Sequence, residues 1–76
     1  MGDRNAVRAV VSAVGARVRE LRRAKRLSQI ALAELAGIHY NTLRRIERGT
    51  SNPSVDALIR IAETLGVTIA QLFGGR

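Results

Sequence analysis

Apolar residues recur at intervals of three and four along most of this chain, which is the spacing of side chains on one face of an α-helix. In the first segment the apolar stripe consists of Val7, Val11, Val14, Val18 and Leu21. The spacing predicts one helix over about residues 5–26, with Gly15 as a weak point inside it. No segment shows the strict alternation of apolar and polar residues that is typical of a half-buried strand. The pattern therefore predicts an all-α fold.

Four further helices are predicted over about residues 29–36, 40–48, 55–65 and 69–73. Glycines suited to the left-handed turn after a helix follow the first three of these segments, at Gly37, Gly49 and Gly66. Residues that can accept hydrogen bonds from the free amides of a helix start precede the four segments, at Ser28, His39, Ser54 and Thr68. The second helix is predicted to be well buried. The fourth is predicted to pack through Val55, Leu58, Ile59, Ala62 and Leu65.

The charge of the chain is the first indication of its function. With 76 residues, the chain is long enough for one domain only. Thirteen Lys and Arg residues outnumber six Asp and Glu, which gives a net charge of +7. Nearly all of the basic residues are Arg, whose guanidinium bonds phosphates and guanine edges with two parallel donors. Charge alone leaves a nucleic acid, a membrane surface and no charged partner as open interpretations.

Several classes of site and location are excluded or disfavoured by composition. The chain has no cysteine, so a disulfide or a thiolate metal site is excluded, and no spacing of metal ligands is present. The chain has one His, which lacks an acid–base partner, and it has no paired carboxylates, so an enzyme is not expected. No cofactor is predicted. No membrane span or secretory signal is recognisable, so a cytoplasmic protein is expected.

The two short segments at 29–36 and 40–48, joined by a tight turn at Gly37, have the outline of a helix-turn-helix. Ala33 supplies the small contact where the two helices would cross. On a helical wheel the buried direction of the second of them is defined by Leu43 and Ile46. The outward positions are then Asn41, Arg44, Arg45 and Arg48, with Tyr40 and Thr42 on the flanks. Asn and Arg are the side chains that bond adenine and guanine edges in the major groove.

Three runs resemble the lambda-repressor/Cro-type family, also called the XRE family. They are Leu27-Ser-Gln-Ile-Ala-Leu-Ala-Glu-Leu-Ala-Gly-Ile38, Thr42-Leu-Arg-Arg-Ile-Glu-Arg-Gly49 and Asn52-Pro-Ser-Val-Asp-Ala-Leu58. The resemblance extends from about Val14 to Phe73 and keeps the order and spacing of the family's motifs. It implies a five-helix, all-α DNA-binding domain. Members of this family are mostly transcriptional repressors or activators that commonly bind as dimers.

The resemblance and the wheel together predict the residues that contact DNA. Base contacts are expected from Tyr40, Asn41, Arg44 and Arg45, of which the wheel favours Tyr40 least. Contacts to the DNA backbone are expected from Gln29, Thr42, Arg48 and Asn52. The resemblance also implies a partly buried ion pair between Arg22 and Glu47, and these two residues are therefore not expected to contact DNA.

The sequence departs from the family pattern at His39, where Ser or Thr is usual. It also departs at Ile30 and Ala31, where the family often has acidic or polar residues, so Ile30 is expected to be exposed. Residues 1–12 are expected to form an N-terminal arm or an extension of the first helix. Arg4 and Arg8 are accordingly either an arm on DNA or solvated charges on a longer helix, and the second interpretation is favoured. The DNA-binding domain is expected over 13–73, and 74–76 as a free end.

The predicted function is a homodimeric repressor that recognises a pseudo-palindromic operator in double-stranded DNA through the major groove. The expected dimer surface is Ile69, Leu72 and Phe73, although Leu72 and Phe73 are equally suited to closing the core of one subunit. One alternative is an antitoxin-type or other protein-binding module that also binds DNA, with Val7, Val10 and Val11 as its apolar patch. The other is the DNA-binding fragment of a longer, ligand-sensing regulator.

Overall fold

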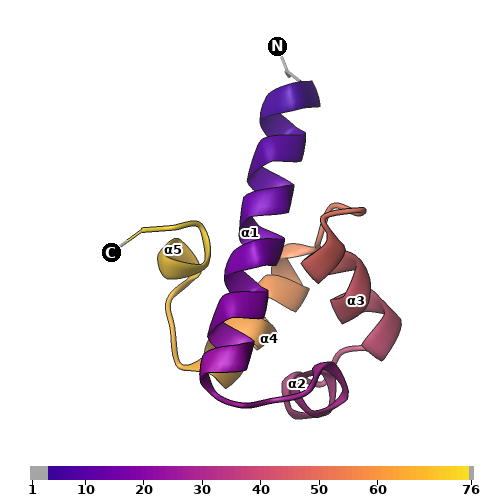
Figure 1. Cartoon of the computed structure of the whole chain (residues 1–76), viewed down its shortest axis with the longest axis vertical. Helices are drawn as coiled ribbons and strands as arrows, with labels where there is room; N and C mark the ends of the chain where they lie inside the picture. The colour runs from indigo at the N-terminus through magenta and orange to yellow at the C-terminus, as the bar shows by residue number, and fades with distance from the viewer. Residues whose placement is uncertain (1–3, 76) are drawn as a thin grey trace.

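The computed structural model describes residues 4–75, which form five helices and no strand (Figure 1). Helix α1 spans Arg4–Ala24, α2 Gln29–Ala36, α3 Tyr40–Arg48, α4 Val55–Leu65 and α5 Ile69–Leu72. The predicted all-α fold of five helices is confirmed. In Figure 1 α1 is a long column, the other helices pack around its C-terminal half, and its first turns project beyond them.

The ends of α1 and α5 differ from the prediction by one or two residues. Helix α1 stops at Ala24 instead of Arg26, because Arg26 takes a left-handed conformation with φ of 57° and turns the chain toward α2. Helix α5 stops at Leu72 instead of Phe73. Residues 4–12 are helical, so this part of the predicted N-terminal segment extends α1, while residues 1–3 and 76 lie outside the described residues.

The helix starts are fixed by the local hydrogen bonds that the sequence predicts. The hydroxyls of Ser28 and Ser54 each accept a hydrogen bond of 3.0 Å from the backbone N–H three residues later. Thr68 and Gln71 exchange two such bonds in a capping box. His39 also caps its helix, because its Nδ1 accepts a bond of 3.2 Å from the Asn41 N–H. The three predicted glycines all adopt the left-handed conformation after their helices.

Residues from all five helices form the core, which is centred on Val18, Leu32, Leu43, Ile46, Ile61, Leu65 and Leu72. The predicted face of α4 is partly wrong, because Val55 is 72% exposed and Ile59 is 42% exposed. Contacts of α4 with α2, α5 and α1 turn Ile61 and Ala57 inward in their place. Helix α2 is less buried than predicted, since Leu35 lies on its outer side, whereas Ile30 is exposed as expected.

Helices α1 and α3 approach each other closely at Gly15. It is buried, and a Cβ at this position would overlap the backbone carbonyl oxygen of Ile46 and lie 3.2 Å from that of Glu47. Gly15 was predicted to be a weak point of α1, but it is required for the packing of α1 against α3. It allows the backbone of α3 to rest directly on α1.

Candidate nucleic-acid interface

A buried ion pair fixes α3 against the rest of the domain. The Arg22 guanidinium donates two hydrogen bonds to the Glu47 carboxylate, at 2.7 Å from Nε and 3.0 Å from Nη2. Only 9% of the Arg22 side chain and 3% of the Glu47 side chain is exposed. Arg22 Nη1 also donates to the Leu27 carbonyl at 2.8 Å, so the turn after α1 is held as well. The pair implied by the family resemblance is therefore present in the structure.

Gln29 joins this network, as expected from the family resemblance, in which the residue at this position braces the helix that follows. Its side-chain amide donates to Glu47 Oε1 at 3.1 Å and ties the start of α2 to α3. The predicted DNA contact of Gln29 is compatible with this bond, because a side-chain amide carries two N–H donors and Glu47 occupies one. The sequence signal for this role is the Ser28-Gln29 pair of the family motif, whereas the acceptor, Glu47, is identified only by the structure.

Three of the four outward positions that the helical wheel predicts on α3 are exposed. These are Asn41, Arg45 and Arg48, whereas the fourth, Arg44, is half-buried. Leu43 and Ile46 are buried on the opposite side, as predicted. The single carboxylate of α3, Glu47, points inward to Arg22 and Gln29. The exposed side of this helix therefore carries positive charge and hydrogen-bond donors without an acidic side chain of its own.

Tyr40 and Arg44 lie against each other at the edge of this face. The Arg44 guanidinium carbon is 5.5 Å from the centre of the Tyr40 ring, in the range of a cation–π contact. A stacked guanidinium keeps its in-plane N–H donors free, so Arg44 is still able to bond a base edge from this position. Tyr40 is 38% exposed and stands on the flank, as the wheel predicts.

The predicted backbone contacts do not lie on one helix. Thr42 is half-buried on α3 and Arg48 is exposed near its end, whereas Gln29 is half-buried at the start of α2. Asn52 is exposed in the loop between α3 and α4. These four side chains thus come from the first turn of α2, from α3 and from the following loop, and only Thr42 lies between residues predicted to contact bases.

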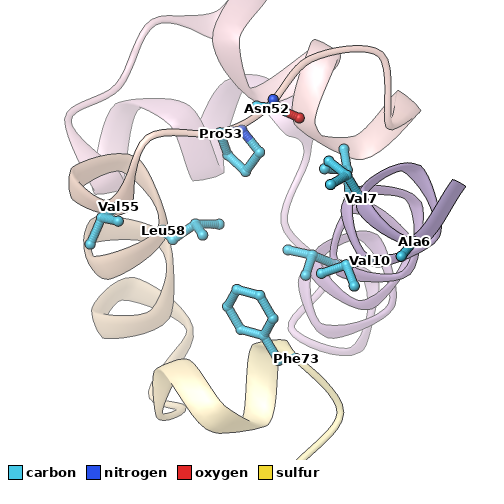
Figure 2. Close-up of a pocket in the computed structure, with 10 residues that line it drawn as sticks. Ala6, Val7, Val10, Asn52, Pro53, Val55, Leu58 and Phe73 are labelled. Atoms are coloured by element: carbon cyan, nitrogen blue, oxygen red, sulfur yellow. The ribbon is translucent and has the colours of Figure 1, made fainter. Parts of the chain in front are cut away.

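The predicted dimer surface is only partly exposed. Leu72 is fully buried in the core of the chain and is therefore removed from that prediction, because its side chain already packs inside the domain. Phe73 is 51% exposed and Ile69 is 37% exposed. The ring of Phe73 points into a shallow groove whose other walls include Val7 and Val10 of α1 and Leu58 of α4 (Figure 2).

This apolar groove contains residues from two surfaces that the sequence predicts as separate. Val7 and Val10, predicted as a patch for a protein partner, are each nearly half exposed and face Phe73 across the groove (Figure 2). Val11 also lines it and is half-buried. The remaining lining residues are Ala6, Val14, Asn52, Pro53, Val55 and Leu58.

Residues 4–75 contain no cluster of three or more His, Asp or Glu side chains able to hold a metal ion. Within the same part of the chain, no helix has the length and apolar character needed to cross a membrane.

The chain is similar to a known family of helix-turn-helix proteins and to several individual proteins. A family model described as "Helix-turn-helix" matches residues 18–72. The immunity repressor protein of Bacillus phage phi105 is 36% identical over 61 residues, which are 80% of this chain and 42% of the repressor. The antitoxin PezA of Streptococcus pneumoniae is 31% identical over 61 residues, which are 80% of this chain and 39% of the antitoxin. The chain thus spans less than half the length of these two curated relatives.

A solved structure matches along nearly its whole length. The restriction-modification controller protein C.AhdI of Aeromonas hydrophila superimposes with a TM-score of 0.80 at 38% sequence identity. The match covers 84% of this chain and 97% of the controller protein.

Proposed function

Because the chain belongs to the helix-turn-helix family of the lambda-repressor/Cro type, we propose that it is a sequence-specific DNA-binding transcriptional regulator. The observation that carries this proposal is the outward face of α3. Asn41, Arg45 and Arg48 are exposed there, and the one carboxylate of the helix is turned inward and bound. One α-helix fits the width of the major groove of B-DNA.

In the proposed mechanism, contacts to the backbone set the position of the domain and contacts to bases select the sequence. The net charge of +7 favours encounter with DNA, because each neutralised phosphate releases condensed counterions. Gln29, Thr42, Arg48 and Asn52 bind phosphates around the first turn of α2 and both ends of α3. Asn41, Arg44 and Arg45 reach base edges, and Tyr40 contributes from the flank. The buried ion pair of Arg22 and Glu47 fixes the position of α3 relative to the rest of the domain, so that the helix is presented to the major groove of DNA.

We further propose that two copies bind as a symmetric dimer that represses transcription. In such a dimer the two α3 helices lie about 34 Å apart and face half-sites one turn of DNA apart. Phe73 and Ile69 are the surface through which the copies associate. The apolar groove that contains Phe73 supports this choice, because burial of exposed apolar side chains is the main driving force for association. Similarity to a phage immunity repressor supports repression as the direction of regulation.

The DNA-binding proposal is tested by selecting bound duplexes from a random pool at about 0.15 M salt, where counterion release still permits specific binding. Enrichment of a pseudo-palindrome with half-sites about 10 base pairs apart is expected. The variant Arg45→Ala should lose about 1–3 kcal/mol of binding free energy and relax the preference at one base pair. Unchanged affinity and base preference in this variant would contradict the assignment of α3 to the major groove.

The dimer is tested separately by sedimentation of the wild-type chain and of Phe73→Ser. Wild-type chains should associate, and the substitution should shift the population to monomer while the domain remains folded, because Phe73 is half exposed. Ile30→Ser on α2 removes a comparably exposed apolar side chain outside the groove and is the matched control. Equal association of all three proteins would contradict the proposed surface.

The alternative functions use the same groove for another occupant. Similarity to the antitoxin PezA favours a module that binds both DNA and a different protein. The partial coverage of the curated relatives favours a DNA-binding part of a longer regulator. A wild-type chain that binds its operator but stays monomeric in sedimentation would select these alternatives over the homodimer.

A further inference from the structure

A polar hollow lies where the start of α1 meets the end of α3. Its walls are Arg8, Val11 and Ser12 of α1 and the loop residues from Gly49 to Asn52. The loop touches α1 here, since a Cβ on Gly49 would be 3.1 Å from the Ser12 Cα. Arg8 is one helical turn before Ser12, so the fold brings its side chain beside the loop that follows α3.

The groups that line the hollow are suited to an anion. Its lining residues include Arg8, Ser12, Ser51 and Asn52, whose side chains carry hydrogen-bond donors, and no Asp or Glu lines it. Arg8 forms no ion pair or hydrogen bond with another residue in the range 4–75. The Thr50 hydroxyl is already used, because it donates to the Arg45 carbonyl at 3.4 Å. An unpaired guanidinium among neutral donors is the arrangement that binds a phosphate oxygen.

Arg8 has one structural role to be distinguished from ligand binding. The hollow borders the C-terminal end of α3, where a positive charge stabilises the helix dipole. The carbonyls at this end are occupied, since the Gly49 and Thr50 amides donate to those of Ile46 and Arg45. Arg8 itself donates to none of them. A purely structural Arg8 would therefore contribute to folding through its charge alone.

We propose that Arg8, from its place on helix α1, completes a site in this hollow for a phosphate of the DNA backbone, beside Asn52, whose backbone contact is expected from the sequence. The inference rests on the proposed DNA-binding function and extends its footprint. Val11 and Asn52 line both the hollow and the apolar groove, so the two sites adjoin each other. Asn52 is itself expected to contact the DNA backbone, so the hollow adjoins a side chain of the proposed DNA-binding surface. The contact there is to backbone and not to bases, so it adds affinity without sequence preference.

The experiment compares operator affinity of the wild type, Arg8→Ala, Arg8→Lys and the control Arg60→Ala over a range of salt concentrations. Arg60→Ala removes the same unit of charge from α4, where Arg60 pairs with Asp56 on the surface. Loss of one phosphate contact lowers the slope of log K against log salt by about 0.9 for each bound chain. We expect this decrease for Arg8→Ala, a wild-type slope for Arg8→Lys and Arg60→Ala, and unchanged base preference in all four proteins.

A second arm locates the phosphate. Uncharged methylphosphonates are substituted one at a time along the operator, and at one position in each half-site the substitution should weaken binding of the wild type and leave binding of Arg8→Ala unaffected. The proposal is overturned if Arg8→Ala keeps the wild-type slope, or if its weaker binding is matched by a lower melting temperature with no change of slope. Failure of the wild type to select any operator would instead overturn the proposed function itself.

Discussion

Replacement of Glu47 by Ala is the substitution expected to have the largest effect on the domain. It removes the acceptor of both hydrogen bonds from the Arg22 Nε and Nη2 atoms and of the bond from Gln29. The Arg22 guanidinium then remains almost fully buried with only the Leu27 carbonyl as a partner. Removing one partner of a buried pair costs about 3–5 kcal/mol, because the remaining charge is not compensated.

This loss is large compared with the total stability of so small a domain. At about 0.05–0.15 kcal/mol per residue, a chain of this length has a free energy of unfolding of about 4–11 kcal/mol. For domains of this size each kcal/mol changes the melting temperature by about 4–8 °C, so Glu47→Ala should lower it by about 12–40 °C. DNA binding is then lost because the domain unfolds, although Glu47 does not face the proposed DNA surface.

Thermal unfolding followed by circular dichroism measures this effect directly. Glu63→Ala is the control, because it removes an exposed carboxylate from α4 that takes part in no ion pair with the other described residues. The double variant Arg22→Met, Glu47→Leu should recover much of the loss, since apolar side chains of similar volume can replace a buried pair. A Glu47→Ala protein that melts with the wild type and the control would refute the reasoning.

Two further substitutions test how the helices are assembled. Gly15→Ala should destabilise the domain by about 1–3 kcal/mol in urea unfolding, because the added Cβ overlaps the Ile46 backbone and α3 must move away from α1. A stabilised Gly15→Ala protein, as expected at an ordinary helix position, would contradict this packing. Ser54→Ala should cost about 1 kcal/mol in the same assay through loss of the cap of α4, and Ser54→Asn should retain the stability.

Helix boundaries were predictable from the sequence because local chemistry decides them. Ser28, Ser54 and Thr68 satisfy backbone amides within three residues of themselves, so their partners are implied by spacing. The outward face of α3 was predictable for a similar reason, since two apolar residues define its buried side. The end of α1 was not, because Arg26 adopts a left-handed conformation that the sequence pattern gives no reason to expect.

Tertiary contacts account for the other departures. The face of α4 is rotated from the predicted stripe because α2 and α5 pack on it, and periodicity alone does not weigh one neighbour against another. Gly15 was recognisable as unusual inside a helix, yet only the position of α3 explains it. The bond from Gln29 to Glu47 joins residues 18 positions apart and follows from the crossing of α2 and α3.

The groove has a consequence for partners that no linear pattern contains. Val7 and Phe73 are near opposite ends of the chain, and the packing of α5 against α1 places them on one surface (Figure 2). If the proposed dimer forms through this groove, a second copy and a different protein would compete for the same surface. Because two linked domains bind a symmetric operator more tightly than one, a protein that occupied the groove of each copy would then lower operator affinity. Under this proposal partner binding and DNA binding would oppose each other through the groove, with no change in the α3 face itself.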